Sequence, residues 1–249
     1  MKSKKTWLLL GASGAIGRAF ARQAAKQGDD IVLLGKDKAD LDLTADDLRA
    51  RYPAVSVAVE ELETSNLEAF EETVEKCKAK AKNPLSVFSA LETVYTQKEC
   101  GKDLGKIKNM FQVNYFSQVY FLSAVAPFLT EQRGGKVIVL GSTAGDYGSI
   151  EDYGYGSTKA ALHVWLQGFQ ADMAASGVSV TTVKVGDLDS LGERKNWAKW
   201  IPVDIDSCAK ACLKYAESGA KVRYFPWYAC LTTLRRFIPK AVWEKMKRE

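Results

Sequence analysis

Short apolar runs alternate with longer amphipathic segments along most of this sequence. The apolar runs have the length of buried strands and lie at Trp7–Leu10, Asp30–Leu34, Val55–Val59, Leu85–Ala90, Val137–Leu140, Val178–Val185 and Val222–Phe225. Helical patterns lie between them, among others at Ala15–Gln27, Lys38–Arg51, Leu67–Lys80, Ile107–Leu129 and Tyr155–Ser176. This repetition predicts right-handed crossovers, and hence an α/β fold with a doubly wound parallel sheet of about seven strands and helices on both faces.

Composition and continuity predict one domain over residues 1–249, because 47% of residues are hydrophobic and no Pro/Ser-rich linker interrupts the pattern. Basic residues are spread along the chain despite the net charge of +5, so we expect no nucleic-acid partner. The N-terminal apolar run is too short for a signal peptide, and no run reaches the length of a membrane span. Five cysteines without a disulfide framework predict reduced thiols in a cytoplasmic protein, and their spacing predicts no metal site.

A glycine-rich turn follows the first predicted strand and leads directly into a helical pattern. Such a turn lets a pyrophosphate approach backbone N–H groups at the positive end of the helix dipole. An ordinary glycine-rich connection is the alternative, but the position after strand one favours a dinucleotide site. The residues expected to bind the cofactor here are Gly11, Ser13, Gly14, Ala15, Ile16 and Gly17.

The end of the second predicted strand bears on cofactor choice. A carboxylate there binds the ribose hydroxyls of NAD, while a cation favours the 2′-phosphate of NADP. Lys36 follows Gly35 at this point, and Asp37 is expected to cap the next helix. The sequence therefore favours NADP through Lys36, with NAD still possible.

Tyr155 and Lys159 are four residues apart on a predicted helix, so they share one face. A neighbouring cation, together with a nicotinamide's positive charge, is expected to lower the pKa of the phenol toward the working range. Ser142 ends the preceding strand and could hydrogen-bond a substrate oxygen. Tyr153 is set aside, because its partner four residues on is Ser157. A solvated helix face is the ordinary explanation of such a pair, but the nearby serine and the glycine turn argue against it.

The order of these features resembles the short-chain dehydrogenase/reductase family over nearly the whole chain. The resemblance implies that Tyr155 is the general acid/base, that Lys159 also binds the nicotinamide ribose, and that Ser142 positions the carbonyl. It implies further that Asn114, in Gln-Val-Asn-Tyr, holds a water in the proton relay. Ala90 and Gly186 match family positions at the cofactor. The implied activity is NADP(H)-dependent hydride transfer between nicotinamide and a small carbonyl or secondary alcohol.

Several positions depart from the family pattern. Ser89-Ala90-Leu91 replaces Asn-Ala-Gly, which is expected to narrow the space beside the adenine-side ribose, and Val185-Gly186 replaces Pro-Gly. The acid after strand three could be Glu60 or Glu61. Ser89-Ala90-Leu91 is the only support for one alternative, a catalytically silent nucleotide-binding sensor or scaffold of the same fold, and the four intact candidate catalytic residues argue against it. A sugar-nucleotide epimerase is disfavoured because no room remains for its substrate domain.

Two segments lie outside the repeating pattern. Residues 187–201 follow the sixth strand and are predicted to form a substrate lid, with a fixed surface helix as the alternative. Residues 226–249 combine aromatic, apolar and basic residues. This aromatic-basic segment could contact a membrane surface or a lipid-linked substrate, but packing against protein is favoured.

A homodimer or homotetramer is expected. His163, the single histidine, is expected to be packed rather than catalytic.

Overall fold

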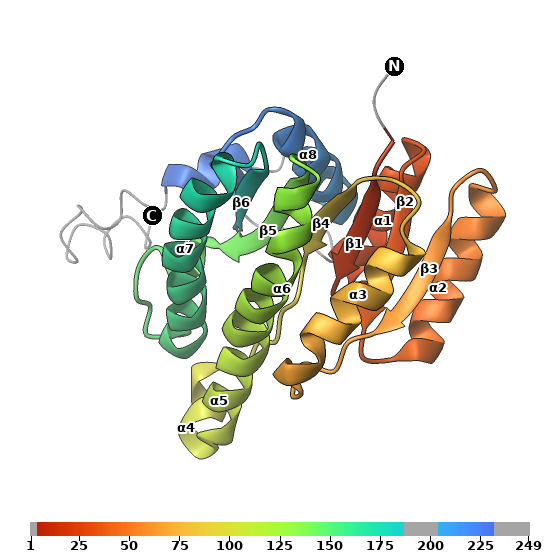
Figure 1. The fold of residues 1–249 in the computed structure, drawn as a ribbon. Helices are drawn as coiled ribbons and strands as arrows, with labels where there is room; N and C mark the ends of the chain where they lie inside the picture. Colours follow the sequence, from red (N-terminus) through yellow and green to blue (C-terminus); the bar gives the residue numbers. More distant parts are fainter. Residues whose placement is uncertain (1–3, 187–203, 232–249) are drawn as a thin grey trace.

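All seven strands of the computed structural model pair in one parallel sheet, in the order β3-β2-β1-β4-β5-β6-β7 (Figure 1). The structure describes residues 4–186 and 204–231. The order reverses between β1 and β4, the switch point beside which open α/β sheets bind their ligands. The predicted doubly wound, Rossmann-type fold is therefore confirmed. The strands are β1 Thr6–Leu10, β2 Asp30–Gly35, β3 Val57–Glu61, β4 Leu85–Ser89, β5 Lys136–Ser142, β6 Ser179–Val185 and β7 Val222–Phe225.

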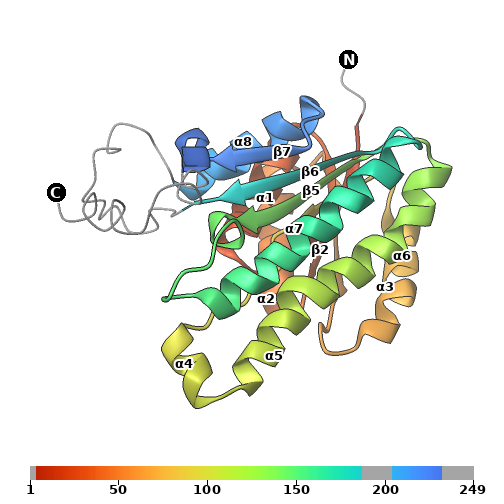
Figure 2. The same ribbon diagram turned by 90° about the vertical axis from the view of Figure 1, so that its left-hand side faces the viewer.

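Eight α-helices occur in the described residues: α1 Ala15–Lys26, α2 Lys38–Arg51, α3 Phe70–Lys80, α4 Gln97–Lys102, α5 Gly105–Phe111, α6 Ser117–Glu131, α7 Tyr153–Ala174 and α8 Ile205–Glu217. Side chains of α1, α2 and α8 share one apolar cluster, and those of α3, α6 and α7 share another. The sheet lies between these two layers (Figure 2). The short helices α4 and α5 extend beyond the sheet on the side where the strands end (Figure 1).

The predicted helix over residues 107–129 is not continuous. The structure divides it into α5, a π-helical turn at Gln112–Phe116, and α6. A π turn holds one extra residue within the helical path, and such turns are frequent at functional sites. The uninterrupted apolar pattern hid this break, because the helical spacing resumes beyond it. Asn114 lies in the π turn and is fully buried.

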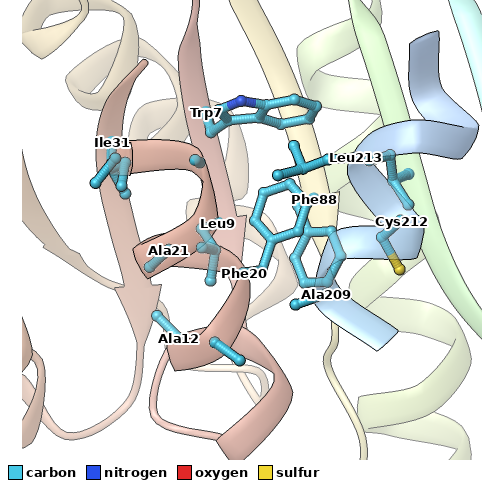
Figure 3. Packing of buried hydrophobic residues seen from close by; sticks show 14 of the residues in the cluster. Trp7, Leu9, Ala12, Phe20, Ala21, Ile31, Phe88, Ala209, Cys212 and Leu213 are labelled. Carbon is cyan, nitrogen blue, oxygen red and sulfur yellow. The ribbon is translucent and has the colours of Figure 1, made fainter. Parts of the chain in front are cut away.

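The core beside the first strand is aromatic. Phe20 of α1 stacks on Phe88 of β4 with ring centroids 3.8 Å apart, and its edge meets Trp7 of β1 at 5.0 Å (Figure 3). Trp7 donates its indole N–H to Asp29 at 3.0 Å, so its buried polar group is satisfied. This packing fixes α1 on the sheet and thereby places the glycine turn at its N-terminus.

Other segments bear on the predictions above. The predicted lid at 187–201 lies outside the described residues, as does the aromatic-basic segment from 232 onward. The beginning of that segment packs on the domain, since Ala229 is buried. None of the helices in the described ranges is long and apolar enough to cross a membrane. All five cysteines are free thiols, and Cys208 and Cys212 share the buried face of α8 as expected.

Candidate active site

The glycine turn brings three segments into close backbone contact. Gly11 has a positive φ of 75°, and a Cβ at this position would lie 2.8 Å from the carbonyl of Ala90. A Cβ at Gly17 would lie 2.3 Å from the Gly11 carbonyl oxygen. Side chains at either position would push α1 away from the sheet. Both glycines are thus required by the fold of the turn itself.

The same turn has room and chemistry for a phosphate group. Gly14 is the N-cap residue of α1, so no capping side chain occupies the N-terminal N–H groups of this helix. Gly14 and Ala15 are exposed. The Ser13 hydroxyl oxygen is buried and has no hydrogen-bond partner among the described residues. A buried hydroxyl is costly to leave unpaired, so it fits a ligand that supplies acceptor atoms. Ile16 is half-buried one residue further into the helix. The cradle suits a dinucleotide pyrophosphate.

Charged groups surround the end of β2. Lys36 is largely exposed, at 80% of its side chain, and its ammonium lies 3.5 Å from the Glu63 carboxylate. Asp37 caps α2 by accepting from the backbone N–H of Asp40, as predicted. Arg18 donates to the Ser13 carbonyl at 3.0 Å and also binds both carboxylate oxygens of Asp40. Arg18 was not among the predicted residues. Its only signal was its position directly after the last glycine of the turn.

Tyr155, Lys159 and Ser142 come together at the carboxyl edge of the sheet. Tyr155 lies in the first turns of α7, which begins two residues earlier than predicted, and is 9% exposed. The Lys159 ammonium lies 5.6 Å from the centre of the Tyr155 ring and donates to the Leu140 carbonyl at 3.4 Å. Ser142 ends β5, and its hydroxyl accepts from the Ala144 N–H at 3.1 Å.

Glu92 is the principal site residue that sequence reasoning missed. It follows β4 in an irregular loop, and its carboxylate accepts a hydrogen bond from the Tyr155 phenol. The other carboxylate oxygen lies 3.8 Å from the Lys159 ammonium. An acid in a loop gives no sequence signal without its spatial neighbours. Glu92 thus bridges the two residues on which the predicted chemistry depends.

Burial, together with this carboxylate, shifts the pKa of Tyr155 in the direction opposite to the one expected. The pKa of the Tyr155 phenol is raised, first by burial and then by the charge of Glu92, while hydrogen bonding with Ser142 acts in the opposite direction. Burial also lowers the pKa of Lys159, and the charge of Glu92 opposes that shift. Burial and Glu92 therefore outweigh the effect expected from Lys159 alone, while the lowering expected from Lys159 together with a nicotinamide's positive charge stays a prediction.

Asn114 is buried close to these residues but is fully engaged elsewhere. Its side-chain oxygen accepts from the Thr93 N–H at 2.7 Å, and its amide donates to the Thr93 carbonyl at 2.9 Å and to the Thr158 hydroxyl at 3.2 Å. No hydrogen bond between Asn114 and Lys159 occurs within the described part of the chain. Asn114 therefore ties the loop after β4 to α7, directly beside Glu92.

The remaining predicted residues lie along the same edge. Ala90 follows β4 and contacts the glycine turn, whereas the Leu91 side chain packs into the core. Gly186 follows β6, donates its N–H to the Phe225 carbonyl at 2.8 Å, and faces Ala229. The residues expected to hold the cofactor thus come from the ends of β1, β2, β4 and β6 and from α7.

His163 is packed, as expected. It is 5% exposed, and burial lowers its pKa to about 3, with the charges of Lys184 and Lys159 acting in the same direction. It is accordingly neutral at physiological pH. Neither ring nitrogen has a hydrogen-bond partner among the described residues.

Comparisons with known proteins agree with this geometry. The short chain dehydrogenase family model matches residues 5–200. An uncharacterized oxidoreductase of Staphylococcus epidermidis is 30% identical over 206 residues, which cover 77% of this chain and 84% of that protein. Two solved structures share the fold. A bulky-bulky ketone specific alcohol dehydrogenase from Comamonas testosteroni has a TM-score of 0.79 at 18% identity, covering 99% of this chain and 92% of that one. A short-chain dehydrogenase from Sphingobium yanoikuyae in complex with NADPH has a TM-score of 0.76 at 21% identity, covering 97% of this chain and 91% of that one.

The glycine turn, the switch point and the extent of the family match define the class. This chain belongs to the short-chain dehydrogenase/reductase family. It is an oxidoreductase of that family, whose members bind NAD or NADP.

Proposed function

We propose that this protein is an NADP(H)-dependent oxidoreductase that interconverts a small carbonyl compound and its secondary alcohol, with Tyr155 as general acid/base. The observation that carries the proposal is the joint placement of a buried phenol, a buried ammonium and the Ser142 hydroxyl at the carboxyl edge of the sheet. The glycine turn opens onto the same edge. Hydride and proton transfer require these two parts side by side.

The chain's own residues account for the proton. A bound nicotinamide cofactor supplies or takes the hydride. Ser142 donates a hydrogen bond to the substrate oxygen and orients it toward Tyr155. Tyr155 gives its proton to that oxygen in reduction and takes one in oxidation. Lys159, buried and within 5.6 Å of the ring centre, stabilises negative charge on the phenol oxygen.

The cofactor preference rests on the charges at the end of β2. Lys36 is exposed and free to turn toward a 2′-phosphate, because its ion pair with Glu63 is long and solvated. Asp37, the carboxylate best placed for the ribose hydroxyls of NAD, is engaged as the cap of α2. The attraction of Lys36 for a 2′-phosphate, and the engagement of Asp37 in the helix cap, support NADP over NAD.

Cofactor titration followed by turnover assays tests the proposal. We expect NADPH to raise the melting temperature more than NADH does, and we expect ketones or aldehydes in a panel to be reduced with loss of NADPH absorbance. Binding of NADPH with no turnover on any carbonyl or alcohol would favour the silent sensor instead. Failure to bind either cofactor would contradict both functions.

Assembly and location complete the proposal. A homodimer or homotetramer is supported by exposed apolar side chains on the π turn, α6 and α7, namely Phe116, Tyr120 and Val164. Free thiols support a cytoplasmic location.

We retain a single domain over 1–249, with 187–201 as a substrate lid and 226–249 as the segment that contacts protein or lipid. Light scattering tests the assembly. Limited proteolysis with and without cofactor tests the lid.

A further inference from the structure

The acid beside the candidate general acid/base has no place in the chemistry described so far. Glu92 lies in the loop after β4, where the sequence departs from the family pattern at Leu91. Its side chain is 37% exposed, whereas Lys159 beside it is 1% exposed. Tyr155 is likewise buried. Within the described part of the chain, Glu92 therefore connects this buried pair to solvent.

The contacts of Glu92 are made on both carboxylate oxygens. Oε1 accepts from the Tyr155 hydroxyl, and Oε2 lies 3.8 Å from the Lys159 ammonium. The next residue, Thr93, is held by Asn114 through both its N–H and its carbonyl. The loop is thus fixed directly beside the acid. Such a short chain of contacts, from solvent to carboxylate to phenol, is a path for a proton.

We propose that Glu92 is the proton-exchange residue of Tyr155, which keeps the phenol protonated and returns its proton after each reduction. This inference rests on the proposed function. When a carbonyl is reduced, the Tyr155 O–H bond breaks and the O–H bond of the product alcohol forms, leaving a phenolate. Glu92 takes a proton from water and passes it to the phenolate oxygen. The net transfer is one proton from solvent to the substrate oxygen.

Among the described residues, the other groups around the phenol do not offer this path. Ser142 hydrogen-bonds the phenol, but a serine hydroxyl does not take up a proton from water. Lys159 is buried and its ammonium is directed to the Leu140 carbonyl. Asp152, at the start of α7, adds negative charge that also disfavours the phenolate. Cys100 and Tyr95, from the α4 region, pack with Tyr155 in one apolar cluster.

The charge of Glu92 also sets a direction. A carboxylate beside the phenol disfavours the phenolate, which is the form needed to take a proton from an alcohol. The protonated phenol, the form needed for reduction, is correspondingly favoured up to high pH. The pair Glu92–Tyr155 therefore biases the site toward carbonyl reduction.

The test compares wild type with Glu92→Gln, which keeps the size of the side chain and removes its charge. Glu131→Gln is the matched control, because Glu131 is 77% exposed at the end of α6 and pairs only loosely with Lys78 at 3.8 Å. Ultraviolet difference titration, with Tyr155→Phe as the reference, follows ionisation of Tyr155 in the protein without cofactor. We expect Glu92→Gln to lower the pKa of Tyr155 by about one unit or more.

Turnover then tests proton exchange. In Glu92→Gln we expect the alkaline loss of carbonyl reduction to begin at lower pH, kcat to fall on the order of tenfold, and the solvent deuterium isotope effect on kcat to increase. An unchanged Tyr155 titration would overturn the proposal. A shifted titration with superimposable pH profiles and isotope effects would overturn the proton-exchange role. If wild type reduces no carbonyl, the proposed function fails, while the titration still decides whether Glu92 controls Tyr155.

Discussion

Asn114 donates its side-chain amide to the hydroxyl of Thr158 at 3.2 Å, and this bond joins the π turn to the helix that carries Tyr155. The same amide group holds Thr93 on both sides, so a single side chain connects three segments. The family resemblance implies a water-holding role for this asparagine. The hydrogen bonds described here indicate an architectural role, which fixes the loop after β4 relative to α7.

Replacing Asn114 should destabilise the fold. Asn114→Ala removes three buried hydrogen bonds and leaves the Thr93 backbone groups without these partners, so we expect a loss of about 2–3 kcal/mol in the free energy of unfolding. Urea denaturation measures it. Asn109→Ala is the control, because Asn109 is exposed on α5 and accepts only a long hydrogen bond from Tyr95. Equal losses in both variants would contradict the architectural role.

Removing the Tyr155 hydroxyl should stop the chemistry but not cofactor binding. Tyr155→Phe keeps the ring in its cluster and removes only the transferable proton, so we expect turnover to fall by roughly 100-fold or more. The dissociation constant of NADPH should stay within about twofold. Tyr153→Phe, two residues earlier on the same helix and 56% exposed, should retain full activity. Retention of more than about a tenth of turnover in Tyr155→Phe would exclude the role.

Reversing one charge should change the cofactor preference. Lys36→Glu replaces attraction by repulsion at the proposed 2′-phosphate position, so NADPH should bind at least about tenfold more weakly while NADH changes little. Isothermal titration with both cofactors measures this difference. Lys38→Glu serves as the control, since Lys38 is the exposed first residue of α2 and pairs with Asp42. Equal losses for both cofactors would mean that Lys36 is a solvated surface charge.

His163 should make stability sensitive to acid. Its folded pKa of about 3 lies below the ordinary histidine value of 6.5, so the unfolded chain binds a proton in this window while the folded protein does not. Stability should therefore fall as pH decreases from 6.5 toward 3, by about 1.4 kcal/mol per pH unit from this group. His163→Gln should lose less stability than wild type between pH 7 and pH 5. Parallel unfolding curves at the two pH values would show that the histidine is not responsible.

The aromatic-basic segment, residues 226–249, allows a test of lipid contact. Ala229 is buried, so a truncation that removes only residues 232–249 leaves this contact in place. If the segment binds anionic lipid, full-length protein should sediment with phosphatidylserine vesicles at low ionic strength and dissociate at high ionic strength. The truncated chain should remain in the supernatant under both conditions. Absence of sedimentation at low ionic strength would leave protein packing as the role of the segment.

The sequence was sufficient for the order and type of the strands because each contains a short apolar or β-branched run, although β3 and β6 also carry polar residues. It was also sufficient to bring Tyr155, Lys159 and Ser142 together, since i and i+4 on a helix and the end of the preceding strand fix their proximity. It was insufficient for Glu92, which reaches Tyr155 across 63 residues through an irregular loop. The pKa of Tyr155 is raised rather than lowered, first because the phenol is buried and then because Glu92, which the pattern does not reveal, lies beside it.

Gly186 and Ala229 pack against each other at the end of β6, and the backbone of Gly186 is bound to Phe225. The end of β6 and the segment after β7 are therefore held together at a contact that has room only for small residues. For protein engineering, Gly186 and Ala229 form a matched pair. A graft from a relative with another substrate should replace or keep these two residues together, because a bulkier residue at either position would force the two backbones apart.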